Sequence, residues 1–141
     1  METTHGTLVK LSPGAALLRG PSGSGKSDLA FRLIDRGAVL VADDRVAVWA
    51  DGDRLIGAPP TALAGLIELR GIGIVEFPYL KEAAIDLVVD LVDSGEIERL
   101  PEDRSCEILG LKLPLAAVAP FETSAPLKVE MMVKAIARKQ L

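Results

Sequence analysis

The sequence predicts an α/β fold in which a mixed β-sheet packs with helices, in a single domain over residues 1–141. Three observations support this. Short apolar runs alternate with glycine, proline and aspartate, as strands joined by tight turns do. Two longer segments, 26–36 and 127–140, are typical of helices. Between an expected strand and the first helix lies Gly20-Pro21-Ser22-Gly23-Ser24-Gly25-Lys26-Ser27, which matches the phosphate-binding pattern GxxxxGK[ST]. The fold class is therefore that of a P-loop nucleotide-binding domain.

The first elements are expected to be a hairpin that leads into the glycine-rich loop. Residues 6–11 and 15–19 are apolar runs separated by the turn signal Ser12-Pro13-Gly14. The helix after the loop runs from about Lys26 to Arg36. It ends at Gly37, because glycine readily takes the left-handed conformation that closes a helix.

The middle of the chain is expected to add three strands and a short helix. Residues 38–42 form a continuous apolar run, which is typical of a buried strand. Residues 46–50 and 54–57 bracket an Asp-Gly-Asp turn and predict a second hairpin. Two prolines follow, and Thr61 is then expected to cap a short helix through Leu66.

The last half is expected to alternate strands and turns before a closing helix. Residues 68–75 contain glycines too dense for a helix and predict a strand with a tight turn. Residues 85–92 show little alternation, so this strand is expected to be central and buried on both faces. Residues 107–111 and 113–119 predict a β pair, and Leu127 to Gln140 a helix with one apolar face.

The glycine-rich loop predicts nucleotide binding with Mg²⁺. Its glycines let the backbone turn so that N–H groups surround phosphates, Lys26 reaches the β and γ oxygens, and the Ser27 hydroxyl ligates the metal. The positive end of the following helix adds to the attraction. The alternative is a glycine-rich turn that merely caps a helix. The strand–loop–helix order favours phosphate binding.

Asp43 and Asp44 are the next candidates. A right-handed crossover through the first helix makes strand 38–42 parallel to strand 15–19, so both end at the same sheet edge. Ligands of open α/β sheets bind there. One carboxylate is expected to hold Mg²⁺, and the other to take a proton from an attacking hydroxyl or orient a water. The alternative is a solvated turn, where aspartate is common.

Further candidates are His5, Glu68 and Arg70. His5 lies in the segment expected beside strand 15–19, although a lone histidine near a terminus is often incidental. Glu68 and Arg70 would face the same side of a strand. A carboxylate for metal and a guanidinium for phosphate is one interpretation, and an ordinary surface ion pair is the other.

Composition narrows the partners. A net charge of −4 gives no support to nucleic acid or an anionic membrane. No signal peptide or membrane-spanning run is visible, so no membrane insertion is expected. The single cysteine, Cys106, excludes an internal disulfide and suits a reducing cytoplasm.

These residues, in this order, resemble the catalytic domain of the HPr kinase/phosphorylase family. Members phosphorylate a serine of the phosphocarrier protein HPr and reverse the modification by phosphorolysis. The resemblance runs from His5 to about Val75 and thins beyond. The matching landmarks are His5-Gly6, the loop Gly20 to Ser27 followed by Asp28, Leu40-Val41-Ala42-Asp43-Asp44, Gly57-Ala58-Pro59 and Ile67-Glu68-Leu69-Arg70-Gly71-Ile72-Gly73-Ile74.

The resemblance assigns roles to these positions. Asp43 matches the catalytic acid/base, and Asp44 beside it supports metal or phosphate. Ser27 and Glu68 match metal-associated positions, His5 a histidine near the phosphates, and Arg70 a signature arginine of the active site. It also implies ATP and Mg²⁺, a fold similar to phosphoenolpyruvate carboxykinase-type P-loop proteins, and a homo-oligomer, a hexamer in full-length members.

Two departures from the family pattern stand out. By this resemblance the chain is expected to start at the catalytic domain, as in the short forms that lack the family's N-terminal domain. Near the C-terminus the family carries a basic, glycine-containing loop, whereas residues 120–126 here hold no arginine.

The expected function is thus an ATP- and Mg²⁺-dependent serine kinase acting on HPr within a phosphotransferase system. Two alternatives remain open at this point: a small-molecule P-loop kinase, and a nucleotide-sensing module with little turnover.

Overall fold

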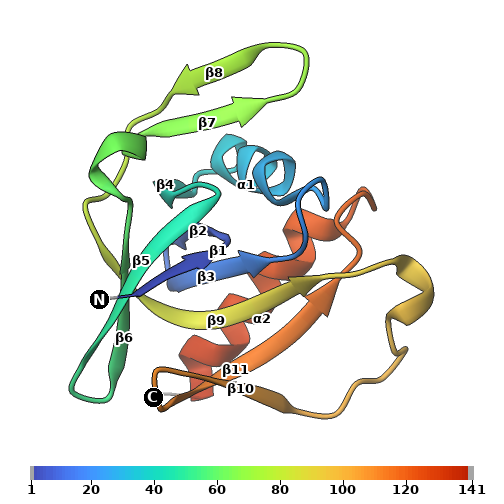
Figure 1. Cartoon of the computed structure of the whole chain (residues 1–141). Coiled ribbons are helices and arrows are strands. Elements are labelled where there is room, and N and C mark those ends of the chain that lie inside the picture. Colours follow the sequence, from blue (N-terminus) through green and yellow to red (C-terminus); the bar gives the residue numbers. More distant parts are fainter. Residues whose placement is uncertain (1, 140–141) are drawn as a thin grey trace.

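The protein folds as a strongly curled, mixed β-sheet with helices packed on one face (Figure 1). The structure, a computed structural model, describes residues 2–139. The strands are β1 (Glu2–His5), β2 (Thr7–Leu11), β3 (Gly14–Arg19), β4 (Val39–Ala42), β5 (Arg45–Asp51), β6 (Arg54–Ala58), β7 (Leu66–Leu69), β8 (Gly73–Glu76), β9 (Ala83–Leu91), β10 (Arg104–Ile108) and β11 (Leu111–Val118). The helices are α1 (Lys26–Asp35) and α2 (Ala125–Lys139), with 3₁₀ turns at Thr61–Leu63 and Ser94–Glu96.

Strand β9 is the centre of the main sheet, whose order is β1-β5-β6-β9-β3-β2-β4. Strand β3 runs parallel to β9 on one side. On the other side, β6 pairs antiparallel with the first residues of β9, and β11 pairs parallel with its last residues. Because β3, β9 and β11 are parallel, the segments that follow them meet at one sheet edge. Those segments begin at Gly20, Val92 and Ala119.

Strand β4 ends at this same edge. It pairs antiparallel with β2, and β2 pairs antiparallel with β3, so β4 and β3 run in the same direction. The predicted direction of the crossover through α1 is confirmed. One strand, β2, lies between the two.

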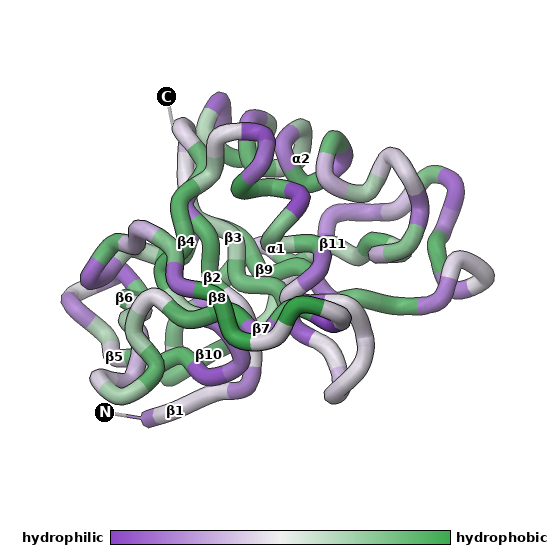
Figure 2. The backbone as a smooth tube through the Cα atoms, turned by 90° about the horizontal axis from the view of Figure 1, so that it is seen from above, coloured by the Kyte–Doolittle hydropathy of each residue, from purple (hydrophilic) through white to green (hydrophobic). Residues whose placement is uncertain are grey.

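Central strands are buried on both faces, as predicted for residues 85–92. Neighbouring residues Leu17 and Leu18 on β3 point to opposite faces and are both fully buried, and so are Val88 and Val89 on β9. One face packs against α1 and α2, and the curl of the sheet encloses the other. In Figure 2, α2 lies on one side of the central strands, and β1 and β5 lie on the opposite side.

The β7–β8 hairpin forms a separate two-stranded sheet, placed beyond α1 at the top of Figure 1. The buried residues Leu40, Ile67 and Leu69 hold it to the rest of the molecule. Phe31 of α1 and Phe77, which follows the hairpin, add an edge-to-face aromatic contact with 6.0 Å between the ring centroids.

Two expectations from the sequence are wrong. The short helix through Leu66 is only a 3₁₀ turn, with Pro60 rather than Thr61 at its N-cap. Gly65 adopts φ +77°, which no right-handed helix allows, and Leu66 starts β7. His5 does not belong to the strand that pairs with β3, because it ends β1, which pairs with β5.

Strand β1 has no predicted counterpart. The remaining strands and helices agree with the predicted ones within a few residues. The predicted end of the last helix, Gln140, lies outside the described residues. Within residues 2–139, no helix is both long and apolar enough to span a bilayer.

We expect Gly57→Ala to destabilise the fold by about 1–3 kcal/mol, the usual cost of overpacking a core. A Cβ at Gly57 would lie 2.6 Å from Leu8 Cδ2 and 3.0 Å from Val46 Cγ1, inside the core enclosed by the curl. Urea denaturation measures the change. Gly95→Ala is the matched control, since a Cβ there meets nothing within 4 Å. Equal stability of the two variants would contradict this packing.

Candidate active site

The loop from Gly20 to Ser27 joins β3 to α1 in a conformation that needs glycine. Gly23 and Gly25 have φ values of +81° and +97°, where a side chain is strained. A Cβ at Gly20 would lie 2.4 Å from Ser24 Oγ. The loop backbone is turned on itself by a hydrogen bond of 3.0 Å from the Ser24 N–H to the Pro21 carbonyl. The loop is therefore compact and sterically specified.

The loop buries polar groups of two side chains, Lys26 and Ser24, that are able to hydrogen-bond to a ligand. Lys26 is only 8% exposed, and its Nζ donates to the carbonyls of Gly20 at 2.7 Å and Pro21 at 3.0 Å. The Ser24 hydroxyl is buried and has no hydrogen-bond partner among the described residues. Buried polar atoms normally find partners. An ammonium group and a free hydroxyl in a glycine cradle suit an anion such as phosphate.

Asp43 is the most connected side chain of the site. It is 6% exposed and follows β4 directly. Its Oδ1 accepts hydrogen bonds from Thr7 Oγ1 at 2.8 Å and from Ser27 Oγ at 2.8 Å, and Oδ2 lies 2.9 Å from the same Ser27 hydroxyl. One carboxylate thus links β2, the first turn of α1 and the end of β4.

The pKa of Asp43 is raised above that of an ordinary aspartate. Burial of the carboxylate is the main cause. The hydrogen bonds from Thr7 and Ser27 act in the opposite direction, the negative charge of Asp44 raises the pKa further, and the Glu68 backbone lowers it. This carboxyl therefore gives up its proton less readily than a solvated one.

Asp44 adopts a left-handed conformation, with φ +68°, which is uncommon for a residue other than glycine. Hydrogen bonds hold it there: the Gly6 N–H donates to the Asp44 carbonyl at 3.1 Å, and the Arg45 N–H to the Asp43 carbonyl at 2.8 Å. The side chain is exposed, directly after buried Asp43. Strained residues of this kind cluster at functional sites.

The other predicted residues lie around this centre. His5 is exposed at the end of β1, next to the Gly6 that bonds Asp44. Glu68 is exposed on β7, and its backbone is close enough to act on Asp43. Arg70 follows β7, and its Nη2 lies 3.8 Å from the position of a Cβ at Gly23. The hairpin thus brings a guanidinium beside the glycine-rich loop.

The carboxylates are not gathered into a metal cage. Within residues 2–139, no group of three or more histidine, cysteine, aspartate or glutamate side chains is placed to hold a metal. Of the residues predicted as metal ligands, Ser27 donates a hydrogen bond from its hydroxyl to Asp43, while Asp44 and Glu68 have exposed side chains.

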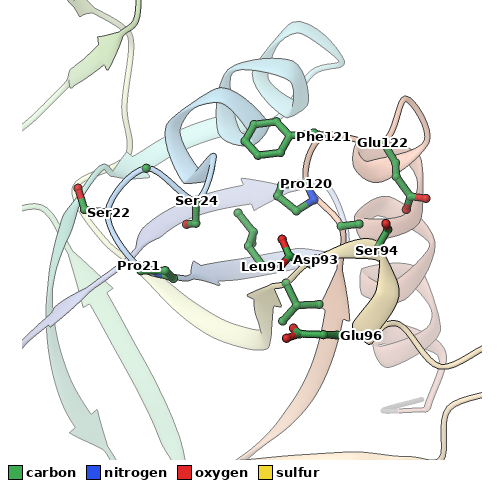
Figure 3. Close-up of a pocket in the computed structure, with 13 residues that line it drawn as sticks. Pro21, Ser22, Ser24, Leu91, Asp93, Ser94, Glu96, Pro120, Phe121 and Glu122 are labelled. Atoms are coloured by element: carbon green, nitrogen blue, oxygen red, sulfur yellow. The ribbon is translucent and has the colours of Figure 1, made fainter.

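A cavity of about 870 Å³ adjoins the loop at the sheet edge (Figure 3). Its walls are loop residues 21–24, the end of β9 with the turn after it, and residues 119–122. Sequence reasoning did not select Thr7 or Phe121 as site residues. The segments that form the cavity walls could have been recognised from the strand topology, because they follow strands that run parallel to β3, and ligands bind at that edge of an α/β sheet.

We expect Asp43→Asn to raise the free energy of unfolding of the metal-free protein at pH 7, with a gain that shrinks towards pH 4. A raised pKa means that stability is complete below the unfolded pKa, about 3.9, and is lost as pH rises through the folded pKa. Asparagine has no proton to lose, and its Oδ1 keeps the acceptor position. Urea denaturation with a chelator, across pH, measures this.

Asp51→Asn, at the exposed end of β5, serves as the control for general charge effects. A gain for Asp43→Asn that does not depend on pH would show that burial of the charge is not its cause.

Comparison with known proteins is consistent with this fold and loop. The family model described as the HPr Serine kinase C-terminal domain matches residues 1–141. The HPr kinase/phosphorylase of Caldicellulosiruptor bescii is 39% identical over 98% of this chain and 48% of its own length. That of Burkholderia lata is 34% identical over 99% of this chain and 46% of its own length.

A solved structure also matches. The Hpr(Ser) kinase/phosphatase from Coxiella burnetii superposes with a TM-score of 0.89 at 28% identity, over 99% of each chain. The chain spans about half the length of the curated relatives it matches. Because the family model matches residues 1–141 and the structure is similar to that of a known HPr(Ser) kinase/phosphatase, the chain belongs to the HPr serine kinase C-terminal domain family.

Proposed function

We propose that this chain is an ATP- and Mg²⁺-dependent kinase that phosphorylates a serine of HPr or an HPr-like phosphocarrier protein. The observation that carries the proposal is the buried Asp43 carboxylate, hydrogen-bonded to Ser27 at the first turn of α1, where the glycine-rich loop ends. Membership of the family supports the substrate class. Relatives that the chain matches are named HPr kinase/phosphorylase.

Residues Gly20 to Ser27 would act as a P-loop that holds the triphosphate. The Lys26 ammonium would exchange the carbonyls of Gly20 and Pro21 for phosphate oxygens, and the Ser24 hydroxyl would gain its missing partner. Ser27 would turn its hydroxyl from Asp43 towards Mg²⁺, with Asp44 and Glu68 as the nearby acids. When bound, the metal neutralises charge on the β and γ phosphates.

Asp43 would act as the general base. Its carboxylate would accept the proton of the substrate serine hydroxyl while the serine oxygen attacks the γ-phosphorus in line and ADP leaves. In the reverse direction, an oxygen of inorganic phosphate would attack the phosphorus of phosphoserine and form pyrophosphate, while the bond from phosphorus to the serine oxygen breaks and protonated Asp43 returns the proton to that oxygen. A raised pKa suits a group that works in both protonation states.

Positive charge for the transferred phosphoryl group would come from Arg70, beside Gly23, with His5 near the phosphates. The family resemblance further predicts a homo-oligomer, a hexamer in full-length members, and a cytoplasmic location. Both remain predictions for this chain.

The proposal is tested by incubating the purified protein with γ-labelled ATP, Mg²⁺ and HPr. We expect label on HPr, and none when the HPr serine is replaced by alanine. The Asp43→Asn variant should lose transfer by about a hundred- to ten-thousandfold and bind ATP within a few fold of wild type, because only the base is removed. ATP binding without labelling would instead favour a metabolite kinase or a nucleotide sensor.

We expect Arg70→Ala to lower the transfer rate about a hundred- to a thousandfold, the usual effect of losing one preorganised donor at the developing charge. Arg70→Lys should recover part of the rate, since an ammonium keeps the charge but not the planar fork. Thermal unfolding should be unchanged because Arg70 is exposed. Arg54→Ala, at the exposed start of β6, is the control. Equal rates for the two alanine variants would refute the role of Arg70.

A further inference from the structure

The cavity beside the glycine-rich loop extends well beyond the place that phosphates would take. Its volume, about 870 Å³, lies in the range of sites that enclose whole cofactors rather than single anions. The loop forms only one wall. The others come from the segments that follow β9 and β11. A ligand whose phosphates lie on the loop therefore has room for a larger group between these segments.

Phe121 stands at the mouth of this cavity with 73% of its surface exposed. In Figure 3 its ring lies beside the start of α1, across the cavity from Glu96. Its Cζ and Cε1 are 3.0 and 3.1 Å from the position of a Cβ at Gly25, so ring and loop are in close contact. An aromatic ring exposed on the wall of a cavity is available to stack on a planar group of a bound ligand.

The segment that carries Phe121 is anchored. The Arg32 guanidinium of α1 donates to the carbonyls of Pro120 and Glu122, and its Nε donates to Asp28 at 3.0 Å. Within the segment, the Glu122 N–H bonds the Ala119 carbonyl at 3.2 Å, and Pro120 is buried. Phe121 is thus held on both sides by fixed backbone, so little conformational entropy is lost when a ligand stacks on it.

The two ends of the cavity differ in charge. The loop end belongs to the segment that carries Lys26, which does not line the cavity itself, whereas Asp93 and Glu96 line the wall after β9. Glu122, on the wall after β11, is paired with Lys128 at 3.2 Å. Phosphates are attracted to the first end and repelled by the second. Carboxylates accept hydrogen bonds from hydroxyl and amino groups, which a ribose and a base supply. A nucleotide therefore fits in one direction, with its phosphates on the loop.

We propose that Phe121 is the stacking residue for the base of the nucleotide, and that Arg32 positions it by holding residues 120–122. This inference rests on the nucleotide binding proposed above and adds a residue for the base. Aromatic rings stack on any base without reading its edge, so Phe121 contributes affinity for the nucleoside more than selection among bases.

The test compares ATP with inorganic tripolyphosphate, which carries the phosphates but no base, by calorimetric titration in the presence of Mg²⁺. We expect Phe121→Ala to weaken ATP binding about fivefold to 150-fold, the range measured for one base on one aromatic ring. Tripolyphosphate binding should stay within about twofold of wild type. Phe121→Trp should retain ATP affinity, and Phe121→Leu, which keeps apolar volume without a ring, should not. Because Phe121 is exposed, these variants should fold.

The matched control is Met131→Ala. Met131 is an exposed apolar residue like Phe121, but it lies on α2 outside the cavity, so its loss should change neither titration. An equal loss for ATP and tripolyphosphate on Phe121→Ala would overturn the proposal, because the ring would then act through the loop; no loss for either would overturn it as well.

The outcomes also separate this inference from the proposed function. A wild-type protein that binds neither ligand contradicts both. ATP binding that depends on Phe121, together with unlabelled HPr, supports the stacking role and contradicts the kinase.

Discussion

The site is organised by the hydrogen bonds that converge on Asp43. Thr7 and Ser27 precede Asp43 by 36 and 16 residues, and the hydroxyl groups of both donate to its Oδ1 at 2.8 Å. These bonds fasten the end of β4 to β2 and to the first turn of α1, so the loop and the carboxylate cannot move independently. The Asp44 backbone, strained at φ +68°, is held by the same arrangement through Gly6. Breaking this centre would leave a buried charge without partners.

The direction of the strands places everything else around that centre. The parallel strands β3, β9 and β11 deliver three connecting segments to one edge, and these enclose the cavity. The sheet also curls, so that antiparallel strands close the second core on its concave side. Family membership agrees with this architecture, because the similarity to the Coxiella burnetii structure extends over 99% of both chains.

The sequence allowed much of this to be predicted where the signal is local. The strand, glycine-rich loop and helix around Lys26 follow one another in the chain, and the crossover rule then located Asp43 at the right edge. The helix through Leu66 was wrong because a single left-handed glycine, Gly65, outweighed a capping signal. Thr7 and Phe121 could not be predicted as site residues, because Thr7 bonds to Asp43 and Phe121 lies against the glycine-rich loop, and no local sequence pattern shows such distant contacts.

The β7–β8 hairpin gives the site a dynamic property. It carries Glu68 and Arg70, yet the buried cluster that holds it to the rest of the molecule, Leu40 of β4 with Ile67 and Leu69, is far smaller than the cores on either face of the main sheet. Segments with few buried contacts open with less free energy than the whole domain requires. The hairpin is therefore expected to open at a lower free energy than the whole domain, and the Arg70 guanidinium lies beside the loop only while the hairpin is packed against α1 and β4. A partner that binds the packed hairpin would then favour the complete site.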